Sequence, residues 1–274
     1  MLAQQRRRQI LTELRRSGAV KVADLTGLLG VSDMTVRRDL EHLSNEGLVE
    51  KVHGGAVVAR QATFEPGFEA KSRLAEPAKL AIAAAAAAMI RPAGAIALSA
   101  GTTTWSMAGL VAKMPNITVV TNSPVVADAI ATENEQMAVI LTGGVRTPSA
   151  ALVGPIADHS IAGLHVDQLF LGVHGMDRQA GFTTPNLAEA KTNQALIAAA
   201  REVVVVADSS KWGVIGFADI APLSAADTVI TDSGLPVRAL DQLRERVANV
   251  VVVDSTGPDG RPDGQLAETP ARDR

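Results

Sequence analysis

The sequence predicts an α/β chain with a separate, mainly α-helical N-terminal domain: a winged helix-turn-helix followed by an open, mainly parallel α/β sheet domain. Three observations predict this fold class. Short amphipathic helical stretches fill residues 2–45 and are followed by a strand-like pair. A polar stretch follows, and beyond it short Val, Ile and Ala runs alternate with longer helical stretches. A length of 274 residues suits about two domains.

The first domain is built around Val31–Asn45, which reads VSDMTVRRDLEHLSN. Ser32 is expected to cap the helix, because its hydroxyl can accept an unpaired N–H of the first turn. The helix has one apolar stripe (Val36, Leu40 and Leu43), and Thr35 and Arg38 project from the opposite face, with Arg37 to the side. Arginines on a short helix suit the DNA major groove, where they pair with guanine or grip a phosphate. A solvated helix face is the alternative.

The neighbouring segments favour the DNA-binding interpretation. Leu2–Ser17 and Val22–Leu29 are predicted helices, and Gly30 supplies the turn into the next helix. This order is typical of a helix-turn-helix. Leu48–Val58 alternates apolar and polar residues around His53-Gly54-Gly55, which predicts a β-hairpin wing, with a flexible hinge as the alternative.

With this pattern, the first sixty residues resemble the DeoR-type helix-turn-helix. The matching residues are Arg6, Ile10, Leu14, Ser32, Thr35, Val36, Arg37, Arg38, Asp39 and Leu40, and Val52–Ala56 (VHGGA) is similar to that family's wing. The resemblance implies a bacterial transcriptional regulator, usually a repressor, that a phosphorylated metabolite releases from its operator. The expected DNA-binding residues are Ser32, Thr35, Arg37, Arg38, His53, Gly54 and Gly55.

Composition agrees with this division. Residues 1–60 carry net charge +3 and the remainder −6, so a basic head precedes an acidic body. The chain has no cysteine, which excludes disulfides and thiolate metal sites, and its five histidines lack metal-ligand spacing, so no metal or cofactor is expected. The alanine-rich Leu80–Ile90 is too short to span a bilayer, so we expect a cytoplasmic protein with no membrane partner.

We expect a DNA-binding domain at 1–59, a linker at 60–77, an α/β effector-binding domain at 78–254 and a disordered tail at 255–274. The predicted strands are Ala95–Ser99, Ile117–Thr121, Ala138–Leu141, Gln168–Val173, Val203–Ala207, Thr228–Thr231 and Val250–Val253. The predicted helices are Lys79–Ile90, Trp105–Lys113, Pro124–Ala131, Ile156–Leu164, Leu187–Ala200 and Pro236–Val247. In such sheets ligands bind at the carboxyl ends of the strands.

The first three of these strands end in small polar residues. Ser99-Ala100-Gly101-Thr102-Thr103-Thr104 lies between a strand and a helix, where backbone N–H groups, hydroxyls and the helix dipole suit a phosphate. A threonine-rich helix cap is the alternative for this loop alone. The next two strands end in Thr121-Asn122-Ser123 and Thr142-Gly143-Gly144, and three such ends in succession favour a shared polar pocket.

Later strand ends add charged groups. Lys211 could supply the positive charge that a phosphate needs. Glu189 opens a helix and could bind sugar hydroxyls or simply favour the helix N-terminus. His174 follows another strand, but a lone histidine is more often structural than functional.

These segments resemble the effector domain of the same family, which shares its fold with ribose-5-phosphate isomerase and glucosamine-6-phosphate deaminase. The matching pieces are Gly101–Thr104, Thr121–Ser123, Gly143-Gly144, Glu189-Ala190 and Asp208–Lys211. Ser99 stands where many relatives carry Asp, and Asn193 and Gln194 stand where many carry Lys and Arg. The expected effector-binding residues are Ser99, Gly101, Thr102, Thr103, Thr104, Asn122, Gly143, Gly144, Glu189 and Lys211.

The function expected from the sequence is a DNA-binding regulator, not an enzyme. It is expected to repress carbohydrate-metabolism genes, to respond to a sugar phosphate, and to bind double-stranded operator DNA as a homo-oligomer, a dimer or tetramer. A sugar-phosphate isomerase or deaminase with a fused DNA-binding head is the alternative, with acid/base candidates Asp177, Glu189, Asp208 and His174. A structural DNA-bridging protein is a third possibility, and it would leave the polar strand ends unexplained.

Overall fold

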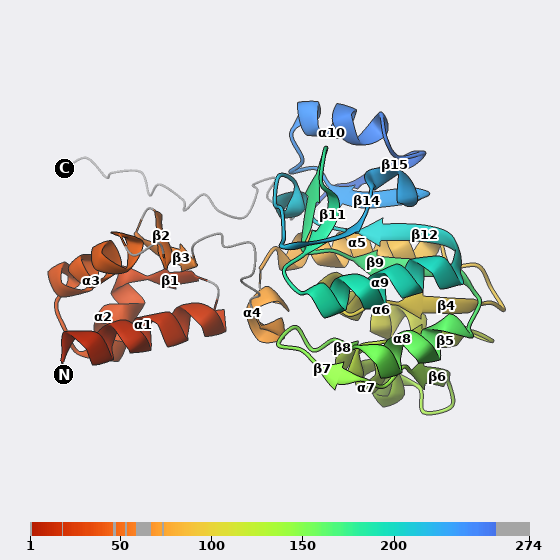
Figure 1. Cartoon of the computed structure of the whole chain (residues 1–274), viewed down its shortest axis with the longest axis horizontal. Helices are drawn as coiled ribbons and strands as arrows, with labels where there is room; N and C mark the ends of the chain where they lie inside the picture. The colour runs from red at the N-terminus through yellow and green to blue at the C-terminus, as the bar shows by residue number, and fades with distance from the viewer. Residues whose placement is uncertain are drawn as a thin grey trace, which may run out of the picture.

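The structure is a computed structural model that describes residues 2–17, 19–45, 48–52, 54–58, 67–72 and 74–255. It consists of a small N-terminal domain and a larger α/β domain (Figure 1). His53, residue 59, residues 60–66 of the expected linker, and nearly all of the expected tail (256–274) lie outside the described residues.

The N-terminal domain is the predicted winged helix-turn-helix. Helices α1 (Ala3–Ser17), α2 (Val22–Leu29) and α3 (Asp33–Asn45) precede the wing strands β2 (Val49–Val52) and β3 (Gly55–Val58). A short strand that the sequence did not predict, β1 (Ala19–Lys21), pairs with β3 and makes the sheet three-stranded, in the order β1-β3-β2. The three helices and the sheet share one core, which includes the predicted stripes: Ile10, Leu14, Val22, Leu25, Leu29, Val36, Leu40 and Leu43.

Gly30 forms the turn between α2 and α3. Its φ of 62° lies in the left-handed region, where a side chain would be strained, and its N–H donates to the Thr26 carbonyl. The turn therefore depends on glycine, as the sequence predicts.

The expected linker at 60–77 contains regular structure. A short helix, α4 (Phe68–Ser72), lies within it, and helix α5 (Glu76–Ala88) begins before its end. Figure 1 places α4 between the two domains, where it contacts α1 of the first and α6 (Thr102–Val111) of the second. A five-residue helix shows too little periodicity for its sequence to predict it.

The larger domain has a seven-stranded sheet in the order β15-β14-β12-β9-β4-β5-β6, and every neighbouring pair is parallel. Its strands are β4 (Ala95–Leu98), β5 (Thr118–Thr121), β6 (Ala138–Leu141), β9 (Val166–Gly172), β12 (Ala200–Val206), β14 (Thr228–Asp232) and β15 (Asn249–Val253). From β4 the strand order runs outward to β5 and β6, and from β9 it runs the other way. The boundary between β4 and β9 is therefore the topological switch point, where ligands bind in such sheets.

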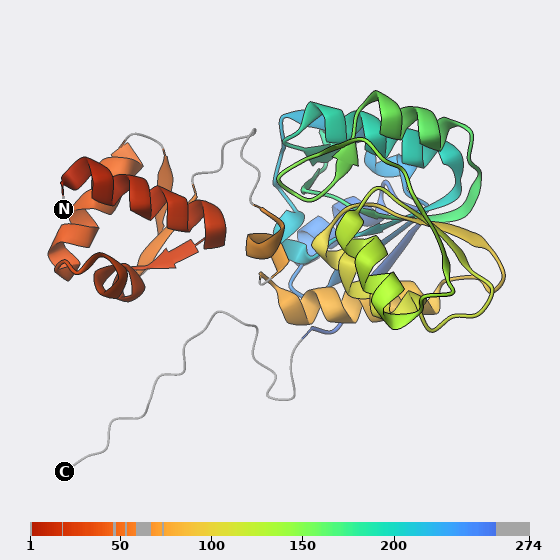
Figure 2. The same cartoon turned by 90° about the horizontal axis from the view of Figure 1, so that it is seen from below.

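Helices cover both faces of the sheet (Figure 2). Helices α5, α6 and α7 (Pro124–Glu133) share one apolar cluster with the sheet. Helices α8 (Pro155–Ala162), α9 (Leu187–Ala199) and α10 (Val237–Arg244) share the other. Successive strand residues alternate between the clusters, as Leu169 and Phe170 do, because strand side chains point to opposite faces. Both faces of the central strands are buried, so these strands read as nearly continuous apolar runs.

The sequence did not predict five short strands outside the main sheet. Strands β10 (Gly175–Asp177), β11 (Gly181–Thr184) and β13 (Ala218–Ala221) form an antiparallel sheet, and β7 (Val145–Arg146) pairs with β8 (Leu152–Val153). Each has two to four residues, too few to show an alternating pattern. They extend the loops at the carboxyl end of the main sheet.

Candidate functional site

Helix α3 presents the polar face that the sequence predicts. Ser32 caps it: the Ser32 Oγ accepts from the Thr35 N–H at 3.3 Å and lies 2.9 Å from the Thr35 Oγ1. Arg37 and Arg38 are both exposed. Arg37 is paired with Asp33 one turn earlier, whereas no acidic side chain in the described part of the chain pairs with Arg38. The two arginines therefore differ in how freely they can reach DNA.

A buried carboxylate joins α3 to α1. The Asp39 side chain is 4% exposed and accepts hydrogen bonds from the Nε atoms of Arg6 and Arg7. These arginines come from the N-terminal half of α1, so the contacts fix the angle between the two helices. The motif residues Arg6 and Asp39 thus position the helix that carries Arg37 and Arg38.

The two wing glycines have different roles. Gly54 is exposed at the hairpin turn, with a φ of 76°. Gly55 is buried, and a Cβ there would lie 2.0 Å from the Val20 carbonyl oxygen of β1. The lack of a side chain at Gly55 therefore allows β1 and β3 to approach each other, and a DNA contact at this residue stays a prediction. His53 lies outside the described residues.

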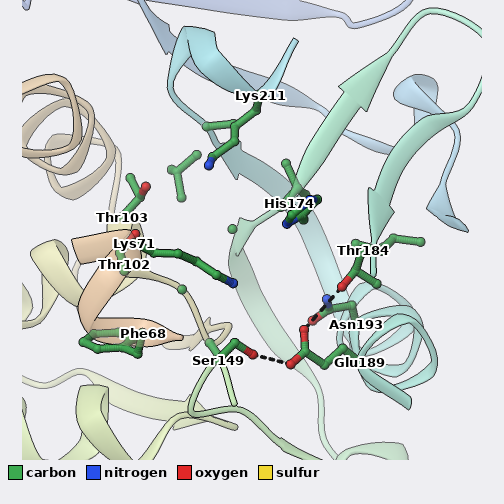
Figure 3. Close-up of a pocket in the computed structure, with 17 residues that line it drawn as sticks. Phe68, Lys71, Thr102, Thr103, Ser149, His174, Thr184, Glu189, Asn193 and Lys211 are labelled. Atoms are coloured by element: carbon green, nitrogen blue, oxygen red, sulfur yellow. Dashed lines mark hydrogen bonds between the residues drawn. The ribbon is translucent and has the colours of Figure 1, made fainter. Parts of the chain in front are cut away.

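A pocket opens at the switch point of the main sheet (Figure 3). Its cavity volume is about 60 Å³, not counting the open mouth. Loops that follow β4, β9 and β12 contribute to it, together with α4 and α9. Its lining residues are Phe68, Lys71, Ala100, Gly101, Thr102, Thr103, Ser149, Gly172, Val173, His174, Thr184, Glu189, Asn193, Val206, Ala207, Lys211 and Ile220.

One end of the pocket is positively charged. Gly101 precedes α6 and Thr102 and Thr103 begin it, so the helix N-terminus, with its unpaired N–H groups, faces the cavity. The side chains of Lys71 and Lys211 point into the same space (Figure 3). This set of donors suits an anion, and a phosphate above all.

The other end presents a carboxylate and neutral polar groups. Glu189 is buried, and its carboxylate accepts hydrogen bonds from the hydroxyls of Thr147, Ser149 and Thr184. Asn193 lies one turn further along α9 and also lines the cavity. A carboxylate held by hydroxyls, with an amide beside it, can accept from and donate to the hydroxyls of a ligand.

Burial and repulsion between positive charges lower the pKa values of three groups around the pocket: Lys211, Lys79 and His174. Burial lowers the pKa of Lys211, although Asp208 opposes the shift. Burial likewise lowers the pKa of Lys79, behind the pocket, to about 8. The pKa of His174 falls to about 4 through burial and the charges of Lys71 and Lys211, so the imidazole is neutral at pH 7.

Half of the predicted effector-binding residues line the pocket: Gly101, Thr102, Thr103, Glu189 and Lys211. Three of the others do not line the pocket, and their side chains bind nearby main-chain groups. The Ser99 Oγ accepts from the Gly172 N–H, the Asn122 Oδ1 accepts from the Ala100 N–H, and the Thr104 Oγ1 donates to the Gly101 carbonyl. These bonds fix the loop that carries Gly101.

Gly143 and Gly144 do not line the pocket either, and an effector contact at these residues stays a prediction. Both have positive φ angles, and a Cβ on Gly144 would lie 2.6 Å from the Val153 carbonyl oxygen. They lie between β6 and β7, and Gly144 packs closely against Val153 of β8. The β7–β8 hairpin carries Thr147 and Ser149 to Glu189, so the two glycines act on the pocket through it.

Several pocket residues escaped the sequence reasoning. Phe68 and Lys71 belong to the expected linker, and Ser149 and Thr184 lie on short unpredicted strands or the loop between them. His174 was expected to be structural and Asn193 was noted only as a departure from the family pattern, but both line the cavity. The signal available in the linker was the basic Lys71, three positions after the aromatic Phe68.

The remaining acid/base candidates do not line the pocket. The Asp177 Oδ1 accepts from the N–H groups of Gln179 and Ala180 and so fixes the turn between β10 and β11. The Asp208 Oδ1 accepts from the N–H and hydroxyl of Ser210. Among the described residues there is no cluster of three or more His, Cys, Asp or Glu that could hold a metal, and no helix long and apolar enough to cross a membrane.

Comparison with known proteins identifies the family of both domains. Two family models match: a DeoR-like helix-turn-helix domain over residues 6–62 and a DeoR C-terminal sensor domain over residues 75–233. A DNA-binding head joined to a sensor domain defines a transcriptional regulator. The chain belongs to the DeoR family.

Curated relatives align over nearly their whole length. The chain is 36% identical to the putative aga operon transcriptional repressor of Escherichia coli O157:H7, over 91% of this chain and 93% of that protein. It is 38% identical to the HTH-type transcriptional regulator GlpR of Haloferax volcanii, over 93% and 98%. It is 29% identical to the L-fucose operon activator of Haemophilus influenzae, over 83% and 91%.

Among solved structures, the chain is similar to ribose 5-phosphate isomerase A from Neisseria gonorrhoeae. The TM-score is 0.37 at 14% identity, over 52% of this chain and 55% of the isomerase. No functional conclusion follows from a likeness this distant.

Proposed function

We propose that this regulator represses carbohydrate-metabolism genes and that a sugar phosphate, bound in the sensor-domain pocket, releases it from its operator. The observation that carries the proposal is the two-ended pocket. Lys71, Lys211 and the N-terminus of α6 surround one end, and Glu189 with its hydroxyl partners and Asn193 forms the other. A phosphate fits the first end and sugar hydroxyls fit the second.

DNA recognition is assigned to α3 and the wing. Thr35, Arg37 and Arg38 face outward on a helix of the length that enters a major groove, and Gly54 lies at the exposed tip of the wing. A single helix-turn-helix binds weakly, so two or more copies of the chain are expected to read repeated half-sites in cytoplasmic DNA.

The two sites are expected to oppose each other. A ligand that favours the arrangement less suited to DNA must lower operator affinity, and DNA must then lower ligand affinity by the same factor. The relatives' names include both a repressor and an activator. We assign repression here, so ligand should weaken operator binding.

Intrinsic fluorescence tests the ligand directly. Trp105 and Trp212 are the two tryptophans of the chain, there is no tyrosine, and each tryptophan is near a pocket residue: Trp105 packs on Phe68, and Trp212 follows Lys211. The protein should be titrated with sugar phosphates and with their unphosphorylated parents, while product formation is followed. Saturation by one phosphorylated compound without turnover is the expected result. Turnover would favour the isomerase or deaminase alternative instead.

Replacing Arg38 with alanine should weaken operator binding by about 1–3 kcal/mol, the usual value of a bidentate arginine–guanine pair. The operator is first selected from random DNA, and affinities are then measured over a range of salt. Arg38→Lys is the matched control, because lysine keeps the charge but lacks the planar fork. A uniform loss on all sequences, with a salt slope smaller by about one, would assign Arg38 to a phosphate instead.

Ligand affinity should fall as the pH rises above about 8. The pKa of Lys79 is lowered to about 8, so this side chain loses its charge in that range unless a bound phosphate raises its pKa again. Binding at pH 8 to 9 should therefore take up protons, which calorimetry in two buffers of different ionisation enthalpy measures. Affinity that stays constant between pH 7 and pH 9 would contradict this assignment.

A further inference from the structure

Helix α4 is held in place by three contacts. Phe68 packs edge-on against Trp105 of α6, with ring centroids 5.8 Å apart. The Lys79 Nζ, from α5, donates hydrogen bonds to the carbonyl oxygens of Lys71 and Leu74. These carbonyls lie at and just beyond the C-terminal end of α4, where a helix leaves acceptors unpaired and where a positive charge is favourable.

Lys79 is an unusual residue to find in this place. It is 3% exposed, although a lysine is almost never fully buried without compensation. Its burial lowers its pKa to about 8. Its two hydrogen bonds go to main-chain carbonyls at the end of α4, so the compensation for its burial comes from anchoring that helix.

The main chain of Lys71 is therefore held in place, while its side chain is available to a ligand. Its carbonyl oxygen binds Lys79, while its side chain points into the pocket (Figure 3). The same helix contacts α1 of the DNA-binding domain, and α1 is bound through Arg6 and Arg7 to Asp39 of α3. One short helix thus touches both the ligand site and the domain that carries the DNA-reading helix.

We infer that α4 transmits pocket occupancy to the DNA-binding domain and that Lys79 is the positioning residue that makes this possible. The inference rests on the proposed function, since it assigns the regulation of that same pocket. A phosphate on Lys71 strengthens the hold of the sensor domain on α4, and the arrangement so favoured is the one less suited to DNA. Without Lys79, α4 no longer follows the occupancy of the pocket.

Hydrogen–deuterium exchange on the intact protein tests this inference, with the peptides that cover α4 as the readout. The probes are inorganic phosphate, at constant ionic strength, and the selected operator DNA. In the wild type, phosphate should slow exchange in α4 and operator DNA should speed it, by linkage. In Lys79→Met, α4 should exchange about five- to tenfold faster, as expected for loss of a helix cap, and should respond to neither probe.

Two further variants sharpen the test. Lys113→Met removes an exposed lysine just beyond α6 and should behave as the wild type. Phe68→Leu keeps the Lys79 hydrogen bonds but weakens the contact with Trp105, so its exchange in α4 should be intermediate. Unfolding curves for each variant separate a local effect from misfolding.

Three results would each overturn a different part of the proposal. Wild-type exchange in Lys79→Met would overturn the positioning role. Protection by phosphate with no response to operator DNA would overturn the transmission role and leave the pocket assignment in place. A response to DNA without any response to phosphate would overturn the proposed anion site and leave α4 as the moving element.

Discussion

Asp39→Ala should destabilise the DNA-binding domain by about 3 kcal/mol and abolish operator binding, because it leaves Arg6 and Arg7 without their shared partner. The estimate stands at the low end for a buried ion pair, since the Arg7 side chain is 29% exposed and water can screen part of its charge. A domain of this size has roughly 3–9 kcal/mol of stability in total, so the loss is severe.

The chain allows the effect to be localised. Both tryptophans belong to the sensor domain, so fluorescence follows that domain alone, whereas circular dichroism follows the helices of both. In urea, Asp39→Ala should shift part of the dichroism transition and leave the fluorescence transition unchanged. Asp33→Ala is the matched control on the same helix: its carboxylate is exposed and pairs with Arg37, and its loss should cost under about 1 kcal/mol. Equal losses for the two variants would contradict the structural role of Asp39.

Lys211→Met should weaken binding of the phosphorylated ligand by about 10- to 100-fold, the value of a hydrogen bond to a charged group. Methionine keeps much of the length and packing of lysine but carries no charge. Affinity for the unphosphorylated parent compound should stay the same, because that compound does not use the positive end of the pocket. Tryptophan fluorescence measures both affinities.

Operator affinity in the absence of ligand gives the second readout for this variant. Lys211→Met should retain it, while ligand should no longer release the DNA at concentrations that release the wild type. Lys191→Met, which removes an exposed lysine of α9, is the matched control and should respond normally. Loss of DNA binding in Lys211→Met would show that the substitution acts on folding rather than on the ligand site.

The main elements of the fold were predictable because their signals are local. The stripe of Val36, Leu40 and Leu43 marks α3, and the central strands of the main sheet read as apolar runs because both of their faces are buried. Strands such as β1 and β13 exist because a partner strand meets them from elsewhere in the chain. A strand of three or four residues is too short to show an alternating pattern, so its own sequence could not predict it.

Pocket residues were predictable where small polar residues directly follow a strand. Gly101, Thr102 and Thr103 follow a strand and begin a helix, which is a pattern visible in sequence. Ser99 and Asn122 carry the same signal, yet their side chains accept from the main-chain N–H groups of Gly172 and Ala100 and do not line the cavity. The orientation of these side chains depends on tertiary packing. Lys71 lines the pocket from helix α4, whose polar composition led to the prediction of a linker.

The strand order also bears on how the protein is made. The wing, the three helices and their core draw on residues close together in the chain, so this domain can fold soon after it leaves the ribosome. The pocket cannot, because β4 pairs with β9 only when Gln168 reaches Ile96, and Lys211 arrives later still. During synthesis there is therefore an interval in which the DNA-reading part is complete and the ligand-binding part is not. A nascent or truncated chain of this kind would have a DNA-binding head that no metabolite could control.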